Sequence, residues 1–473
     1  MNVTFCVRQA AKSISLLVLA LNICVGSASG QENKVSSANQ SSEDTGLLSG
    51  PMVGYGEITE VMLWVQTTRP AAVQFRFWSD SLPGFSALSD PVQTSKENDC
   101  IAQVRLSHLE PGARYSYELY LDGRLISRPY RLSFQTQPLW QWRTDPPNFT
   151  VAIGSCAYIN ETEYDRPGKP YGGDFEIFRA IAAKQPDVML WLGDNVYYRE
   201  VEFYSAAQMR HRYRHDRALP EWQALLGATH HYAIWDDHDY GPNDSDWTYR
   251  MKEESLRIFK SYWANPSYGL AETPGIFFSF LWDDIEFFML DDRYHRSPND
   301  APASPEKVMF GAAQIRWLKE ALIASHAPFK VIAGGSQMLN PVVVGEAFGQ
   351  FEHEQRELLQ WIKGNRINGI FFLSGDKHHT ELIRRQEENF YPLYDYTCSP
   401  LTSGTHKASE DASNPARVSG TFVTGKRNFG MLRFDGPRQD RRVTMECYDK
   451  DGKQLWQHVV KASELRVSER RSE

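Results

Sequence analysis

Five apolar segments of this chain run directly into side chains that bind metals or carry out acid–base chemistry. They are FTVAIGSC (149–156), DVMLWLGD (187–194), HHYAIWDDHD (230–239), DIEFFMLDDR (284–293) and INGIFFLSGDKHH (367–379). Short apolar runs of this kind predict buried strands. In α/β sheets, ligand-binding groups gather at the carboxyl ends of the strands. The five endings together therefore predict a single site, and their residue types predict that it binds metal.

Each ending taken alone has an ordinary structural explanation. Asp194 after a strand is explained equally well as a helix cap or a turn residue, and the histidines after Asp376 as surface groups. The acidic cluster of Asp236, Asp237 and Asp239 is harder to explain in this way. Clustered like charges beside a buried strand repel one another unless a cation or solvent holds them. The five strand endings together favour a metal centre over a separate structural role for each.

Amphipathic stretches with 3.6-residue spacing lie between these segments. They are DFEIFRAIAAKQ (174–185), EESLRIFKSYW (253–263), AAQIRWLKEALIAS (312–325) and HEQRELLQWIKG (353–364), and their periodicity predicts helices. Strands that alternate with helices predict an α/β layered domain. We place this domain at residues 149–460.

Residues 50–137 instead predict short strands separated by turns that contain glycine and proline. The strand-like stretches are EVMLWVQT (60–67), AVQFRFWS (72–79), IAQVRLSHL (101–109), YSYELYL (115–121) and YRLSFQT (130–136). Within LEPGARYSYELYLDG, Leu109, Pro111, Gly112 and Tyr115 resemble the tyrosine corner of fibronectin type III domains. This region has no ionisable cluster. We therefore expect a small β-sandwich that packs against the rest of the chain or positions it, followed by a linker at residues 138–148.

The N-terminus has the pattern of a signal peptide over residues 1–30. Arg8 and Lys12 precede a short apolar core, and the small residues SASG follow it. The core is short for a membrane span, which leaves a membrane anchor as the alternative. Arg8 has no arginine neighbour, so a twin-arginine route is not indicated. We expect export to the periplasm or beyond, a disordered leader over 31–49, and a charged tail over 461–473.

Charge and cysteine usage limit the partners and the chemistry. The net charge of −8 lacks the basic footprint of a nucleic-acid-binding protein, so any attraction for a phosphate-bearing substrate must be local. Four cysteines remain after signal removal: Cys100, Cys156, Cys398 and Cys447. They suffice for two disulfides in an oxidising compartment, with Cys398 and Cys447 as a candidate pair. The place of Cys156 at a strand end indicates a metal ligand instead. Nothing in the sequence indicates the oligomeric state.

Four motifs, in order along the chain, resemble the alkaline phosphatase D (PhoD-like) family of metallophosphoesterases. They are GSCAY (154–158), GDNVYY (193–198), WDDHDYGPND (235–244) and LSGDKHHTEL (373–382). The resemblance implies a pair of β-sheets flanked by helices, with metals at one edge and a β-sandwich ahead of the catalytic domain. It also implies hydrolysis of phosphate mono- and diesters. No stable membrane span is expected in the mature chain.

The resemblance implies a ligand set for two metals: Cys156, Asp194, Tyr197, Asp237, Asp376 and His378. Cys156 replaces the Asp-x-His block of the wider metallophosphoesterase superfamily, and Tyr197 matches the phenolate position shared with purple acid phosphatases. One metal would be held by Cys156, Asp194, Tyr197 and His378. The second would be held by Asp194 as a bridge together with Asp237 and Asp376.

A charge count supports the metals that the resemblance implies, Fe3+ and Ca2+. One thiolate, one phenolate and three aspartates carry five negative charges when all are deprotonated, which one trivalent and one divalent ion balance. Ferric iron suits the mixed sulfur, oxygen and nitrogen site. The nearly all-carboxylate second site favours calcium, magnesium or manganese over zinc. Two Zn2+ ions remain the alternative, because thiolate and imidazole also suit zinc.

Three further residues are candidates for catalysis in a two-metal hydrolysis of the phosphate ester. His238 is expected to protonate the leaving oxygen or to stabilise the transition state, with a structural capping role as the alternative, and Asp239 is expected to orient it. Arg293 is expected to bind the phosphate through its planar guanidinium, with a surface ion pair as the alternative. The competing function is an extracellular binding or adhesion protein with a degenerate site. The intact set of candidate ligands argues for the enzyme.

Overall fold

The computed structural model describes residues 45–467 of the 473-residue chain, except residues 80, 83, 344 and 407–412. Two mixed β-sheets, one of nine strands and one of six, form the centre of this part. The larger contains, in spatial order, β21 (Gln454–Lys461), β20 (Arg442–Asp449), β19 (Asn428–Asp435), β10 (Phe149–Gly154), β11 (Val188–Leu192), β12 (His230–Ile234), β1 (Leu47–Gly56), β2 (Glu60–Thr67) and β6 (Ile101–Ser107). Strands β10, β11, β12 and β1 run parallel. Their carboxyl ends therefore lie at one edge of the sheet.

The smaller central sheet has the order β13 (Phe278–Trp282), β14 (Ile285–Met289), β15 (Lys330–Ala333), β16 (Ile370–Ser374), β18 (Leu393–Thr397) and β17 (Glu381–Arg385). Strands β14, β15, β16 and β18 run parallel. Aromatic side chains join the two sheets: the rings of Tyr232 and Phe280 stack with centroids 3.8 Å apart, and Phe287 meets the ring of Phe434 edge-on. The predicted pair of sheets is confirmed.

A third sheet packs against β1, β2 and β6 and completes a sandwich. It contains β4 (Ser86–Leu88), β3 (Ala72–Trp78), β7 (Arg114–Leu121) and β8 (Arg124–Ile126), with β5 (Val92–Gln93) paired to β3 and β9 (Ser133–Gln135) paired to β7. The two layers share an apolar core that includes Val53, Leu63 and Phe75. The hydroxyl of Tyr115 accepts a hydrogen bond from the amide of Glu110 at 2.9 Å, which is the contact of a tyrosine corner. Because β1 also pairs with β12, one layer of the sandwich continues the larger central sheet.

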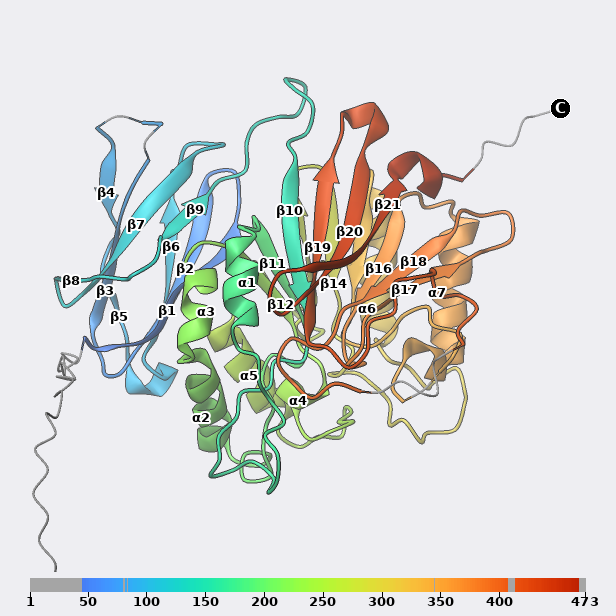
Figure 1. Ribbon diagram of the computed structural model, residues 1–473, viewed down its shortest axis with the longest axis horizontal. Coiled ribbons are helices and arrows are strands. Elements are labelled where there is room, and N and C mark those ends of the chain that lie inside the picture. The colour runs from blue at the N-terminus through green and yellow to red at the C-terminus, as the bar shows by residue number, and fades with distance from the viewer. Residues whose placement is uncertain (1–44, 80, 83, 344, 407–412, 468–473) are drawn as a thin grey trace, which may run out of the picture. The chain divides into compact units, whose positions relative to one another are not determined.

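Helices lie beside both central sheets (Figure 1). They are α1 (Ile177–Ala183), α2 (Ala206–Arg217), α3 (Pro220–Leu226), α4 (Asp237–Tyr240), α5 (Lys252–Tyr262), α6 (Ala312–Ala324) and α7 (Glu352–Gly364), with the 3-10 turns η1 (Lys96–Asn98), η2 (Phe348–Gln350), η3 (Arg438–Asp440) and η4 (Ala462–Leu465). The predicted helices correspond to α1, α5, α6 and α7. Helix α2 was not predicted, because it buries the polar side chains of Arg212, Asp216 and Arg217 where a periodic pattern requires apolar ones.

The expected boundaries of the terminal segments need correction. Strand β1 begins at Leu47, so residues 47–49 belong to the sandwich and not to a disordered leader. Near the other end, the turn η4 buries Leu465, so the segment from 461 begins as packed structure. The predicted signal peptide (1–30) and the last residues of the predicted tail lie outside the described residues. Within the described residues, no helix has the length and apolar character needed to cross a membrane.

All four cysteines of the described residues are buried free thiols. The alternative with two disulfides is therefore wrong for this structure. Cys398 and Cys447 lie close together, and their sulfur atoms are 3.9 Å and 3.7 Å from the same side-chain oxygen, Oδ1 of Asn428. The two thiols are thus polar groups of the core that share one hydrogen-bond acceptor.

Candidate metal centre

The loops that follow β10, β11, β12 and β16 carry the predicted ligands. Cys156 follows β10, Asp194 follows β11 and Asp237 follows β12, while Asp376 and His378 follow β16 of the second sheet. Parallel strands place their carboxyl ends at the same edge, where α/β proteins bind their ligands. In Figure 1 this edge lies close to α4.

Cys156, Asp194 and His378 offer ligand atoms that all lie within 4.8 Å of one another. The Sγ atom of Cys156 is 3.5 Å from Oδ2 of Asp194. The hydroxyl of Tyr197 is 2.9 Å from the same oxygen and 3.2 Å from Nε2 of His378. Nδ1 of His378 lies 2.5 Å from the carbonyl oxygen of Gly404, which only accepts. The proton therefore belongs on Nδ1, and Nε2 is left with the lone pair that a metal requires.

A second group contains Asp194, Asp237 and His238. The amide of His238 donates to Oδ1 of Asp194 at 3.2 Å, and Oδ2 of Asp237 accepts from the amide of Asp244 at 2.8 Å. The other oxygen of Asp237, Oδ1, is buried without a hydrogen-bond partner among the described residues. A buried carboxylate oxygen of this kind is costly unless a donor or a cation satisfies it. The unpartnered oxygen and the mixed donor set fit a metal site.

A third group, which consists of Asp236, Asp237 and Glu346, already contains a cation. Nε of Arg293 donates to Oδ1 of Asp236 at 2.5 Å, and both terminal nitrogens of Arg293 donate to the carboxylate of Glu346. Arg296 donates to the same carboxylate at 2.8 Å. Both guanidinium groups are fully buried, so the alternative of a surface ion pair for Arg293 is wrong. The hydrogen bonds described for its side chain are with the carboxylates of Asp236 and Glu346 and the backbone carbonyl of Ser245, which leaves phosphate binding by this residue without support.

Four of the predicted ligands have an uncommon backbone conformation. The φ angles of Cys156, Asp194, Asp376 and His378 are 61°, 54°, 65° and 54°, in the left-handed region that non-glycine residues rarely adopt. Such a conformation costs on the order of 1–3 kcal/mol per residue and persists only where the surrounding structure enforces it. The concentration of these residues in the loops where the two sheets meet supports a functional site there.

The electrostatics of the cluster favour a bound cation. Burial raises the pKa of the Cys156 thiol to about 11. Burial, and then the charge of Asp237, raise the pKa of Asp194 well above its usual range. The pKa of Tyr197 is also raised, first by burial and then by Asp194. Burial opposes the ionised form of Asp237, but the neighbouring His238 and Arg293 outweigh it and lower its pKa. A metal replaces the protons that such groups otherwise keep.

The contacts of Asp239 differ from its expected role, and Asp376 lies outside the three groups of ligand atoms. Oδ1 of Asp239 accepts from the amide of Asp236 at 2.7 Å, and Oδ2 accepts from the amide and the side chain of Asn195. These contacts cap α4 and hold the loop that carries Asp194. No contact that the structure describes for Asp239 involves His238. The carboxylate of Asp376 lies 3.2 Å from Nζ of Lys377 and, among the described residues, belongs to none of the three groups.

Sequence reasoning missed three residues around the predicted site, two of which contact predicted ligands. The hydroxyl of Ser399 donates to Sγ of Cys156 at 3.0 Å, and the hydroxyl of Tyr171 lies 3.1 Å from Nδ1 of His378. Glu346 is the third, through Arg293. Glu346 lies in the long loop between β15 and α7, with no apolar strand directly before it. The pattern that revealed the other residues is therefore absent at this position.

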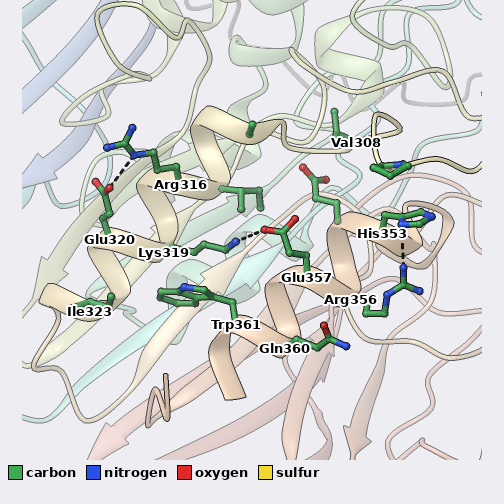
Figure 2. A pocket seen from close by; sticks show the side chains of 14 residues that line it. Val308, Arg316, Lys319, Glu320, Ile323, His353, Arg356, Glu357, Gln360 and Trp361 are labelled. Carbon is green, nitrogen blue, oxygen red and sulfur yellow. Dashed lines mark hydrogen bonds and ion pairs between the residues drawn. The ribbon is translucent and has the colours of Figure 1, made fainter. Parts of the chain in front are cut away.

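A surface hollow lies away from these groups, between α6 and α7 (Figure 2). Its volume is about 720 Å3, and none of the predicted metal ligands lines it. Its charged side chains pair with one another, as Lys319 does with Glu357 at 2.6 Å and Arg316 with Glu320 at 2.9 Å. The hollow therefore gives no indication of a ligand.

Comparison with known protein families matches residues 151–437 to the family described as PhoD-like phosphatase. The match covers more than half of the chain and contains all of the predicted ligands. The chain belongs to the PhoD-like phosphatase family. Family and fold together make this PhoD-like protein a metallophosphoesterase, a hydrolase of phosphoric esters. Membership of this family implies dependence on metal, in agreement with the ligand groups described above.

Solved structures show the same fold. A structure of PhoD gives a TM-score of 0.71 at 16% sequence identity and covers 88% of this chain and 92% of that chain. The purple acid phosphatase PPD1 from yellow lupin (Lupinus luteus) seeds gives a TM-score of 0.60 at 11% identity, and covers 87% of this chain and 74% of that one. Residues 44–139, ahead of the PhoD-like region, match a domain of unknown function, DUF7800. No curated protein sequence matches the chain.

Proposed function

We propose that this chain is an exported metal-dependent phosphoesterase that hydrolyses phosphate mono- or diesters with the help of two metal ions. The observation that carries the proposal is the convergence of Cys156, Asp194 and His378 within 4.8 Å, with the Tyr197 hydroxyl in contact with two of them. Asp194 also belongs to the second group, with Asp237. A residue shared by two adjacent groups is suited to bridge two ions.

The first metal would be held by Cys156, Asp194, Tyr197 and Nε2 of His378. The second would be held by Asp194 and Asp237, with Asp376 reaching it from the facing loop. Metal ions bound there would neutralise phosphoryl oxygens and make a water molecule more acidic. Fe3+ and Ca2+ suit these two donor sets, because the first offers sulfur, phenolate and imidazole and the second offers carboxylate oxygens. Two Zn2+ ions are the alternative.

His238 is the residue that we assign to the leaving oxygen of the ester. It follows Asp237 directly, belongs to the second group of ligand atoms, and its ring lies 4.2 Å from that of Tyr197, centroid to centroid. Asp239 would act by holding the Asp194 loop. Arg293 would act by fixing Asp236, the N-cap residue of α4, next to Asp237 and His238.

The export proposed here is supported by the signal-like residues 1–30 of the sequence, which favour a periplasmic or extracellular site of action. The competing function is an extracellular binding or adhesion protein with a degenerate site. Every predicted ligand is present, and three of them converge on one point, which favours the enzyme.

The metal content of the purified mature protein, measured by plasma mass spectrometry, tests the proposal. We expect about one equivalent of iron together with calcium, as two adjacent sites require. About two equivalents of zinc would still support a phosphoesterase, with zinc in place of iron and calcium. The second measurement is the hydrolysis of a monoester, p-nitrophenyl phosphate, and of a diester, bis(p-nitrophenyl) phosphate. If the protein binds no metal even after incubation with metal ions, and cleaves neither ester, the competing function of an extracellular binding or adhesion protein is favoured instead.

A further inference from the structure

The ammonium group of Lys377 lies at the edge of the metal-ligand groups. Lys377 stands in the chain between two predicted ligands, Asp376 and His378. Its Nζ atom is 3.2 Å from Oδ2 of Asp376 and donates to the backbone carbonyl of Glu346. The side chain of Glu346 is bound by Arg293, which also holds Asp236. The ammonium therefore lies between the loop of the first-metal ligand His378 and the loop of Glu346.

The position of Lys377 is fixed by its backbone. Its amide donates to the carbonyl oxygen of Gly375 at 2.8 Å, and both of its neighbours, Asp376 and His378, have left-handed φ angles. On the opposite side, Gly345 has a φ of +63°, and a Cβ atom built there would lie 3.6 Å from Nζ of Lys377. The ammonium itself is held between the two loops by the carbonyl of Glu346 and the carboxylate of Asp376.

The side chain of Lys377 is more exposed to solvent than the arginine side chains of the same region. The side chain of Arg293 is 0% exposed, whereas that of Lys377 is 10% exposed and that of its partner Asp376 is 23% exposed. Lys377 and Asp376 therefore keep a contact with solvent that the buried network around Glu346 lacks. An ammonium is a compact charge with three N–H donors on a flexible stem, and it binds phosphate as a point charge.

The charge balance of the site calls for such a group. The chain carries a net charge of −8, and the first two ligand groups contribute the carboxyls of Asp194 and Asp237, so an anionic ester needs a local attraction. We propose that Lys377 binds a non-bridging oxygen of the substrate's phosphoryl group. This inference rests on the phosphoesterase function proposed above, and it gives Lys377 the phosphate contact that the sequence had suggested for Arg293. Binding of Asp376 to the second metal would release the ammonium from its present carboxylate partner.

The affinity of the metal-loaded protein for inorganic phosphate, measured by calorimetry, tests this inference without depending on turnover. We expect Lys377→Met to weaken phosphate binding by about 10- to 100-fold, the range for loss of one charge-assisted hydrogen bond. KM for the ester should rise by a similar factor, while kcat changes less. Lys377→Arg keeps the positive charge and should restore most of the affinity. Lys319→Met removes a lysine of similar exposure from a surface ion pair with Glu357 and should leave phosphate binding unchanged.

Metal content and melting temperature distinguish substrate binding from a purely structural role. Wild-type phosphate affinity in Lys377→Met would overturn the inference, as would loss of metal from that variant. Lys377→Gln, which keeps a donor for the Glu346 carbonyl, replaces Lys377→Met if the latter does not fold. If phosphate binding depends on Lys377 but the wild type cleaves no ester, the proposed function fails and this inference stands. If the wild type cleaves esters and Lys377→Met keeps the wild-type affinity for phosphate, the proposed function stands and this inference fails.

Discussion

The Sγ atom of Cys156 lies 3.5 Å from Oδ2 of Asp194, although the two residues follow different strands, β10 and β11. Oδ1 of the same carboxylate accepts from the amide of His238 at the start of α4. Asp194 therefore contacts both the first and the second group of ligand atoms, whereas Cys156 contacts only the first. The two residues should differ in how many ions depend on them.

Asp194→Asn should remove both metals, because an amide offers one weak oxygen where a bridging carboxylate offers two charged ones. Cys156→Ser should mainly weaken the first metal, because the second group does not include the thiol. Plasma mass spectrometry of each variant measures the outcome. Cys398→Ser is the matched control, since it changes a buried thiol that bonds to the carbonyl of Ile153. Full retention of metal and activity in both Asp194→Asn and Cys156→Ser would contradict the assignment of the site.

The buried network around Glu346 should contribute to stability far more than a surface ion pair does. Glu346→Gln removes the charge that faces Arg293 and Arg296, both fully buried. Removing one partner leaves a buried charge uncompensated, and we expect a loss of about 3 kcal/mol in the free energy of unfolding. Denaturant unfolding of the wild type and of Glu346→Gln measures this loss, provided that the two proteins have the same m value.

Glu357→Gln provides the control for Glu346→Gln. Glu357 pairs with Lys319 at 2.6 Å but is 71% exposed. Solvent screens such a pair, so its loss should cost less than about 1 kcal/mol. Equal losses in the two variants would show that the network around Glu346 adds no more than a surface contact.

The parts of the fold that could be predicted are those with a local pattern. Strand β11 is a continuous apolar run because all five of its residues are buried, and α7 shows a regular apolar face because one side of it packs and the other meets solvent. Helix α2 could not be predicted, since its buried side includes Arg212, which is held by Glu202 and Asp216. No apolar periodicity marks a face that is buried through ion pairs.

The candidate site could be predicted to the same extent and for the same reason. Cys156, Asp194 and Asp237 each follow an apolar strand, so their meeting at one edge follows from parallel pairing. The contact between Tyr197 and His378 could not be derived in this way, because it joins two different sheets. The packing of those sheets sets its distance. Glu346 follows no strand, and the buried partners of Arg293 have no signature in the sequence around them.

Gly54 should be required where the sandwich joins the catalytic domain. It lies in β1, and a Cβ atom built on it would be 2.4 Å from Cβ and 2.8 Å from the carbonyl oxygen of Ala264. The amide of the next residue, Tyr55, donates to that carbonyl at 3.0 Å, so the two segments cannot separate without losing the bond. Gly54→Ala should therefore destabilise the protein by about 1–3 kcal/mol through overpacking.

Thermal or denaturant unfolding of Gly54→Ala can be compared with that of Gly364→Ala. Gly364 is the last residue of α7, and a Cβ atom there meets nothing within 4 Å. Alanine favours the helix over glycine by up to about 1 kcal/mol, so this variant should be unchanged or slightly more stable. A Gly54→Ala protein as stable as the Gly364→Ala protein would show that the junction is more adaptable than its geometry indicates.

The imidazole of His231 should make the folded state less stable at acidic pH. It is fully buried, and its Nδ1 accepts from the indole of Trp191 at 2.9 Å while Nε2 lies 3.2 Å from the carbonyl oxygen of Leu225. Both nitrogens are thus satisfied by the neutral ring. Burial lowers the pKa of His231 to about 3, whereas an unfolded histidine has a pKa of about 6.5. As the pH falls below about 6.5, the unfolded chain gains a proton that the folded chain refuses, and stability is lost until the folded pKa is reached.

His231→Gln removes this titration and isolates it from the other ionisable groups. The difference in free energy of unfolding between the wild type and the variant should fall by roughly 2 kcal/mol between pH 7 and pH 5. Urea titrations of both proteins at these two pH values measure the difference. Because every other group titrates alike in the two proteins, its contribution cancels in this comparison. Parallel pH dependence would mean that the folded protein accepts the proton at His231, through an opening of the packing around Trp191 that the structure does not contain.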